Sequence, residues 1–282
     1  MNKMKWLSVT IILIAAVSSF LLLQLDSQSE QGLLNTFFEK DNEQENKQVP
    51  EKMETKTEAS DALAEQEDPF LICIDPGHQL KANLEPEPIG PGAQETKYKV
   101  SGGTTGAVTG TPEHALTLKA SILLKKELEK KGFRVIMTRT TADVNISNKE
   151  RAEIANQQEA DLFVRVHADG SESAKTSGFS VLVPAKDTPY TTAIFADSEQ
   201  AAKLVLASVS QKIPLYETGL FYRSNLSGFN WSKVPVILTE IGFMTNPEED
   251  VKLADSTYLT NLMQLTANGI EQYAKTKQEM SE

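Results

Sequence analysis

Cysteine and histidine are scarce in this chain of 282 residues. The single cysteine, Cys73, excludes a disulfide bond within the chain. It lies in an apolar run, so we interpret it as a buried, unreactive thiol rather than a nucleophile. Basic tracts are also absent and the formal net charge is −11, so nucleic acid is not an expected partner. The sequence does not specify an oligomeric state, and we expect a monomer.

The negative charge is concentrated in one segment. Residues 26–68 contain 13 Asp and Glu side chains against 4 Lys, whereas the rest of the chain is only mildly acidic. A segment of this composition buries too little apolar surface to offset the entropy lost on folding. We therefore predict an acidic, disordered linker over residues 26–68.

An uncharged apolar run precedes the linker at residues 6–25. As a helix it would be long enough for a hydrocarbon core of about 30 Å. Lys3 and Lys5 precede the run, which favours export of the remaining chain. A cleaved signal peptide is the alternative, but the run continues past Ala16 and Ser18, where cleavage would fall. We favour an uncleaved membrane anchor within residues 1–25.

From residue 69 onward, apolar runs alternate with segments of helical pattern. Strands are expected at about 70–75, 133–138, 162–167, 179–183 and 236–240, and helices at about 111–131, 147–159, 196–212 and 256–275. This alternation predicts a single α/β domain over residues 69–276, followed by a short tail, 277–282. We expect a mixed, mostly parallel sheet of about five to six strands, covered by helices on both faces.

Two of the helix starts carry local signals. Thr111 is the expected N-cap of the first helix, with Pro112 in the first helical position. Ser147 and Glu150 have the spacing of a capping box at the start of the second helix.

Two of the three histidines follow apolar strands. His78 comes directly after the Asp75-Pro76-Gly77 turn, and His167 ends the run 162–166. In open α/β sheets, ligands bind at the carboxyl ends of the strands. Hydrolytic zinc sites use three protein ligands and leave one position for water. His78 and His167 are therefore candidate ligands, although either could be an ordinary core or surface histidine.

The third ligand should come from the first turn of the helix that follows the first strand. Glu113 and His114 both lie there. Glu240 is a further candidate site residue, because a carboxylate within the apolar stretch 234–243 is costly unless it is paired, metal-bound or functional. A structural ion pair with Arg139 or Arg165 is the alternative.

The connection between residues 79 and 110 is long and rich in glycine. Long connections in compact domains are usually functional or disordered. Because this one follows His78 directly, it is either a lid or wall of the site or an inserted surface loop.

Several short strings carry a resemblance to a known family. They are Ile74-Asp75-Pro76-Gly77-His78, Pro112-Glu113, Met137-Thr138-Arg139, Glu150-Arg151 with Ala155-Asn156, the run from Ala160 to Asp169, and the run from Thr239 to Asn246. Their order along the chain, from about 70 to 275, resembles the zinc-dependent N-acetylmuramoyl-L-alanine amidases of the amidase-3 type, which are bacterial cell-wall hydrolases.

This resemblance implies a role for each matching residue. His78, Glu113 and His167 would hold one zinc ion, and Glu240 would be the catalytic general base. His114 would be a neighbour of the site rather than a ligand. Three further matching residues look structural in the family: Arg139, Arg151 and Asn156.

The implied substrate is peptidoglycan, at the amide between N-acetylmuramic acid and the L-alanine of the stem peptide. The implied location is the outer face of the cytoplasmic membrane or the cell wall. Two alternatives are a catalytically silent peptidoglycan-binding or regulatory domain, and a zinc peptidase acting on the stem peptide. Arg165 and Asp169 depart from the family pattern, which often has a small or hydroxylic residue and an Asn there, so substrate preference stays open.

Overall fold

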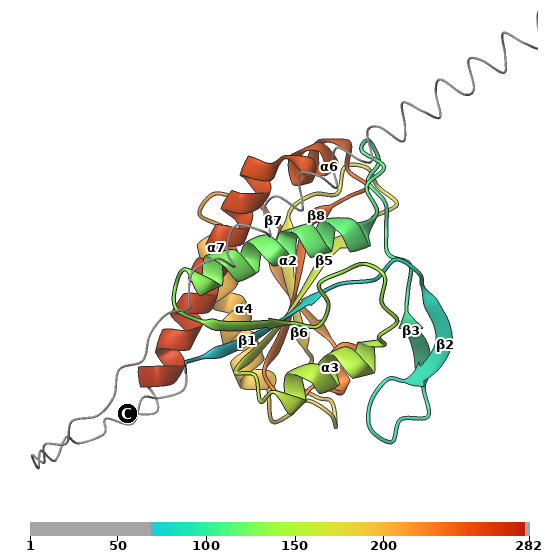
Figure 1. Cartoon of the computed structure of the whole chain (residues 1–282), viewed down its shortest axis with the longest axis vertical. Helices are drawn as coiled ribbons and strands as arrows, with labels where there is room; N and C mark the ends of the chain where they lie inside the picture. Colours follow the sequence, from blue (N-terminus) through green and yellow to red (C-terminus); the bar gives the residue numbers. More distant parts are fainter. Residues whose placement is uncertain (1–68, 280–282) are drawn as a thin grey trace, which may run out of the picture. The chain divides into compact units, whose positions relative to one another are not determined.

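A six-stranded sheet forms the centre of the computed structural model, which describes residues 69–279 (Figure 1). Its strands, in spatial order, are β4 (Arg134–Met137), β1 (Leu71–Pro76), β5 (Leu162–Asp169), β8 (Val236–Phe243), β6 (Phe179–Pro184) and β7 (Leu215–Arg223). The four strands from β4 to β8 run parallel, and β6 is antiparallel to β8. The predicted mixed, mostly parallel sheet is confirmed.

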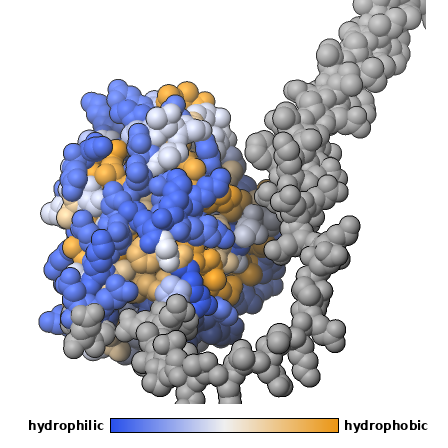
Figure 2. Space-filling model, turned by 60° about the vertical axis from the view of Figure 1, so that its left-hand side comes forward, coloured by the Kyte–Doolittle hydropathy of each residue, from blue (hydrophilic) through white to orange (hydrophobic). Residues whose placement is uncertain are grey.

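Helices cover both faces of this sheet. Helices α2 (Glu113–Glu129), α4 (Phe195–Val209) and α7 (Ser256–Glu279) share one apolar cluster with the sheet, and α3 (Asn148–Gln157) and α5 (Ser227–Asn230) share another. A short helix, α6 (Pro247–Ala254), contacts β8 and α7. On the face drawn in Figure 2, hydrophilic residues surround several apolar patches, as expected when the apolar sides of the helices face the sheet.

Strand β1 is buried along its whole length. Ile72 and Ile74 belong to the cluster beneath α2, and Leu71 and Cys73 to the cluster beneath α3. Each large aliphatic side chain buried in this way contributes about 1.5–3 kcal/mol relative to exposure. Burial also raises the pKa of the Cys73 thiol, so Cys73 is the unreactive core residue that the sequence predicts.

A buried charged residue, Asp75, lies near the C-terminal end of strand β1. Its carboxylate accepts hydrogen bonds from Arg151 Nη1 at 2.8 Å, Arg165 Nε at 2.9 Å and the Thr138 hydroxyl at 2.5 Å. Burial raises the pKa of Asp75, but Arg151 and Arg165 outweigh that effect and hold the pKa well below its usual range. The carboxylate is therefore ionised and fixes the C-terminal end of β1 to β4, α3 and β5.

The start of α2 differs from the prediction. The N-cap is Pro112, which has no side chain for capping, and the helix begins at Glu113. Thr111 is not the cap, because the backbone of an incoming loop takes that role. The carbonyl of Thr104 accepts from Glu113 N at 3.0 Å, and the Glu113 carboxylate accepts from Thr104 N at 2.8 Å. The capping box of Ser147 and Glu150 is confirmed.

Further differences are strands that the sequence did not predict and the end of one helix. The segment after His78 contains a hairpin of β2 (Asn83–Pro88) and β3 (Thr96–Val100), and β7 forms an edge of the main sheet. Helix α7 extends to Glu279, beyond the predicted end at 275.

The anchor predicted within residues 1–25 and the linker predicted over 26–68 lie outside the described residues, as does the end of the tail. Within residues 69–279, no helix is both long enough and apolar enough to cross a membrane.

Replacement of Asp75 by asparagine tests the buried charge cluster. We expect Asp75→Asn to lower the free energy of unfolding by about 3–5 kcal/mol at pH 7, because two buried guanidinium groups lose their counter-charge. Since the pKa of Asp75 is lower in the folded state, its contribution is complete above about pH 4 and declines as the pH falls below it. Urea denaturation of both proteins at pH 7 measures the loss of unfolding free energy. The same measurement on the wild type at decreasing pH follows the decline of the Asp75 contribution.

The matched control is Glu85→Gln, which removes the exposed partner of Lys99. This substitution should leave the urea midpoint unchanged, since exposed pairs contribute little. Equal midpoints for wild type and Asp75→Asn at pH 7 would contradict the role given to Asp75.

Candidate metal centre

The structure brings His78, Glu113 and His167 together at the carboxyl ends of β1 and β5. Their ligand atoms all lie within 4.8 Å of one another. Glu113 Oε1 is 3.0 Å from His78 Nε2 and 3.2 Å from His167 Nδ1. His114 is not part of this cluster, and its carbonyl accepts a hydrogen bond from Arg139 instead.

The turn after β1 sets the position of His78. Its backbone has a left-handed conformation with φ of 59°. The carbonyl oxygens of Pro76 and Gly77 accept from Arg139, and those of Pro76 and His78 accept from Arg151. The ring is oriented by a 3.0 Å hydrogen bond from His78 Nδ1 to a backbone carbonyl, that of Ser101. Two arginines thus hold the turn through its carbonyl groups.

The hydrogen bond between His78 Nδ1 and the Ser101 carbonyl determines which ring nitrogen of His78 is free to bind a metal. A carbonyl oxygen only accepts, so Nδ1 of His78 carries a proton and donates it to Ser101. The other ring nitrogen, Nε2, faces the Glu113 carboxylate at 3.0 Å. A ring nitrogen and a carboxylate oxygen this close have a proton or a cation between them, which is the arrangement expected of metal ligands.

Glu113 is held in its position by backbone donors. Thr104 N donates to Oε2 at 2.8 Å and Ala168 N to Oε1 at 3.2 Å. Burial raises the pKa of Glu113, but hydrogen bonds from His167 and His78 outweigh it and keep the pKa well below its usual range. The side chain therefore contributes a negative charge to the cluster.

His167 lies against Gly77. A Cβ atom on that glycine would stand 2.5 Å from the His167 ring, so only glycine allows this approach. Burial is the main cause that lowers the pKa of His167 to about 4, so the ring is neutral at pH 7. Its Nε2 is buried and has no hydrogen-bond partner among the described residues. Two imidazoles and one carboxylate, with an unsatisfied ring nitrogen, fit a divalent zinc ion.

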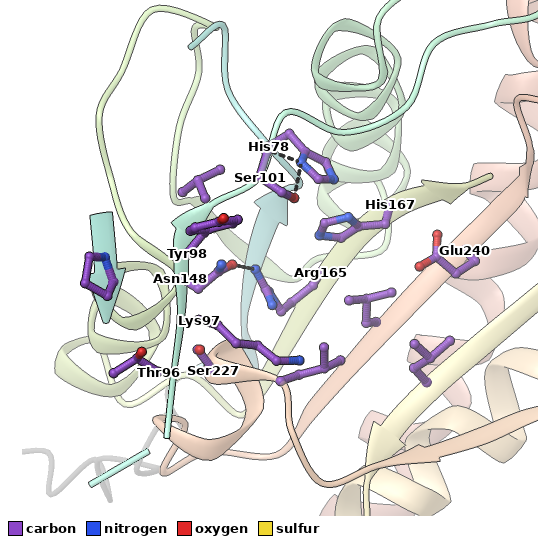
Figure 3. Close-up of a pocket in the computed structure, with 15 residues that line it drawn as sticks. His78, Thr96, Lys97, Tyr98, Ser101, Asn148, Arg165, His167, Ser227 and Glu240 are labelled. Atoms are coloured by element: carbon purple, nitrogen blue, oxygen red, sulfur yellow. Dashed lines mark hydrogen bonds between the residues drawn. The ribbon is translucent and has the colours of Figure 1, made fainter. Parts of the chain in front are cut away.

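Glu240 lies on β8 directly opposite His167 on β5. Figure 3 shows the two side chains on neighbouring strands beside the same cavity. Neither Arg139 nor Arg165 hydrogen-bonds Glu240, and its Oε2 is buried without a partner among the described residues. The alternative of a structural pair with either arginine is therefore wrong. Burial, then repulsion from Glu113 and Asp169, raises the pKa of Glu240 well above its usual value.

Two cavities meet at this cluster, and His78, His167 and Glu240 line both. The larger, about 650 Å³, lies between the main sheet and the β2–β3 hairpin, so this part of the connection is a wall of the site. The smaller, about 550 Å³, is lined by residues 168–172 and by Thr245. Sequence patterns had not indicated the hairpin residues Lys97 and Tyr98, or Asn148 and Ser227, which also line the larger cavity.

Three candidate ligands beside a buried carboxylate form an arrangement that is typical of mononuclear zinc hydrolases. Comparison with known proteins identifies the family. The family model described as N-acetylmuramoyl-L-alanine amidase, amidase 3, matches residues 72–272. The chain belongs to this family.

Individual relatives agree with the family match. N-acetylmuramoyl-L-alanine amidase Rv3717 of Mycobacterium tuberculosis is 30% identical over 217 residues, which cover 73% of this chain and 82% of the relative. The crystal structure of the N-acetylmuramyl-L-alanine amidase Ami1 of Mycobacterium smegmatis superposes with a TM-score of 0.67 at 28% identity, covering 73% of this chain and 97% of that one.

A staphylococcal relative matches over a smaller share of its own length. The protein named "Probable cell wall amidase LytH" of Staphylococcus epidermidis is 27% identical over 176 residues, which cover 61% of this chain. The match spans 55% of that relative, little more than half its length.

Removal of single ligands tests the metal centre. We expect His78→Ala and His167→Ala each to lower zinc affinity by more than about 100-fold, because even outer-shell partners of a metal contribute 10–100-fold. Competition with a zinc-sensitive dye measures the affinity. His114→Ala is the control, since its ring lies outside the cluster, and it should bind zinc like the wild type. Full zinc occupancy in both ligand variants would overturn the assignment.

Proposed function

We propose that this protein is a zinc-dependent N-acetylmuramoyl-L-alanine amidase, with one zinc ion held by His78, Glu113 and His167. It would hydrolyse the amide between N-acetylmuramic acid and L-alanine in peptidoglycan. The observation that carries this proposal is the juxtaposition of the three-residue cluster with the buried Glu240. Membership of the amidase family supports the substrate class.

Zinc, when bound, supplies a Lewis acid for the scissile carbonyl and lowers the pKa of a water molecule toward about 7. The protein supplies the proton transfers. Glu240 accepts the proton of the attacking water and then donates it to the nitrogen of the leaving L-alanine. No covalent intermediate with the protein is required.

The surroundings of Glu240 suit a group that both accepts and donates a proton. Burial and two neighbouring carboxylates raise its pKa, which favours the protonated form. The positive charge of a divalent cation acts in the opposite direction and favours the carboxylate. These opposing effects suit a carboxyl group that first accepts a proton and then donates it.

We also propose the organisation predicted from the sequence: a membrane anchor within residues 1–25, a linker over 26–68 and a catalytic domain over 69–276. This arrangement would place the enzyme at the outer face of the membrane or in the cell wall. A disordered linker of this length has a root-mean-square span of about 35 Å by random-coil scaling, enough to let the domain reach nearby wall.

The role of Glu240 is tested by Glu240→Gln. We expect this variant to bind zinc as the wild type does and to lose about 10²–10⁴-fold in kcat, because the amide cannot accept the water proton. Release of soluble fragments from purified peptidoglycan measures activity. Glu172→Gln, which alters an exposed carboxylate that lines the smaller cavity, should retain activity. An active Glu240→Gln enzyme would exclude Glu240 as the base.

Mass spectrometry of the fragments separates the candidate activities. An amidase releases peptides that begin with alanine and leaves the sugar intact, whereas a peptidase on the stem peptide leaves alanine attached to the sugar. A catalytically silent binding domain would release neither, with or without added zinc.

A further inference from the structure

The larger cavity contains positive charge that the proposed reaction does not use. Arg165 reaches the cavity from β5 in the main sheet, and Lys97 reaches it from β3 in the facing hairpin. Figure 3 shows both side chains extending into the space below His167. The two cations therefore come from opposite walls of one cavity.

Arg165 is 3% exposed and only partly paired. Its Nε donates to Asp75 at 2.9 Å and its Nη2 to Asn148 Oδ1 at 2.6 Å, while Nη1 makes no hydrogen bond within residues 69–279. Asp75 also pairs with Arg151 at 2.8 Å. One carboxylate is thus shared by two guanidinium groups, and Arg165, one of the two, lines the cavity.

Lys97 has no acidic partner in the described part of the chain, although it is partly buried. Lys99, two residues along the same strand, pairs with Glu85 at 2.7 Å and does not line the cavity. Figure 3 shows the Lys97 amine directed from the hairpin toward the main sheet. An ammonium group in this position is available to a bound anion.

The spacing of these groups from the metal centre matches a short peptide. Arg165 and His167 are two residues apart on one face of β5, which corresponds to about 7 Å along a strand. An extended peptide advances by at most about 3.5 Å per residue. A carboxylate on the second residue of a stem peptide would therefore reach Arg165 while the scissile amide lies at the cluster.

The smaller cavity is unsuited to the same anion. Asp169 and Glu172 line it, and both carry carboxylates that repel a negative group. The larger cavity is thus the one in which an acidic peptide is favoured.

We propose that Arg165 and Lys97 form a carboxylate-binding subsite, which selects stem peptides with a free carboxylate on the residue after L-alanine. This inference rests on the proposed amidase function and assigns the peptide to the larger cavity. When the second residue is a glutamate linked through its side chain, its α-carboxylate is free and takes this place. Amidation of that carboxylate removes the charge while keeping the shape.

The test compares two substrates that differ in this group alone. One is N-acetylmuramoyl-L-alanyl-D-glutamyl-L-lysine, and the other carries a carboxamide in place of the glutamyl α-carboxylate. We expect kcat/KM for the wild type to be about 10–100-fold higher for the carboxylate, as for hydrogen bonds to charged groups. The corresponding free tripeptides should show the same preference when their binding to Glu240→Gln is measured by calorimetry.

Single substitutions test whether Lys97 and Arg165 cause the preference for the carboxylate substrate. Lys97→Gln and Arg165→Gln should each reduce the ratio of the two kcat/KM values toward one, and Lys99→Gln is the matched control that should keep it. Arg165 also pairs with Asp75, so thermal unfolding checks the fold of Arg165→Gln. If Arg165→Gln is unfolded, the comparison of Lys97→Gln with the wild type decides whether the subsite exists.

The outcomes distinguish this inference from the proposed function. A wild-type enzyme that hydrolyses both substrates at equal rates, with equal binding of both tripeptides, overturns the subsite and leaves the amidase function standing. A zinc-loaded wild type that hydrolyses neither these substrates nor peptidoglycan overturns the amidase function itself. A preference that survives in Lys97→Gln and Arg165→Gln assigns carboxylate recognition to other residues and overturns the proposal.

Discussion

The buried carboxylate of Asp75 is the interaction on which the site depends. It joins β1 to arginines on α3 and β5 and to Thr138 after β4, so that one charge fixes three neighbouring elements. Arg151 then reaches further to the carbonyls of the turn that carries His78. Because an ionised group deep in the core is stable only when fully paired, this network admits few alternative arrangements. The position of His78 is a consequence of core electrostatics.

Parallel strands explain why the remaining groups meet. The adjacent strands β1, β5 and β8 end at one edge of the sheet, and His78, His167 and Glu240 follow or occupy those ends. Glu113 joins them because α2 begins beside the same edge. The resulting distribution of charge is uneven, with acceptor groups at the cluster and two cationic side chains, Arg165 and Lys97, in the larger cavity. A substrate with a neutral sugar and an acidic peptide would be oriented by this asymmetry.

Much of this arrangement could be predicted from the sequence, because the strands β1, β5 and β8 are mainly apolar runs and the candidate site residues lie at or near their carboxyl ends. The pattern alone could not choose between Glu113 and His114, which are adjacent in one helical turn, and only the family resemblance separated them. Strand β7 was missed because Glu217 and Gly219 interrupt its apolar pattern in the sequence. Both residues have positive φ in the structure, so the strand is also irregular there. The β2–β3 hairpin was missed because Pro86 and Pro88 argue against a strand, although an isolated two-stranded sheet has edges that tolerate proline. The partners of Arg165 depend on contacts between distant segments, which no local pattern encodes.

The turn that carries His78 is held by donors from Arg139 and Arg151 and by a hydrogen bond from its own Gly77 N to the carbonyl of Val166 on β5. In small zinc domains the free energy of metal binding is also the free energy of folding. Here the ligand positions are set when the sheet forms, so little conformational entropy remains to be lost when an ion enters. An ion held by the proposed ligands could therefore exchange while the protein stays folded, and occupancy of the site would follow the supply of that ion.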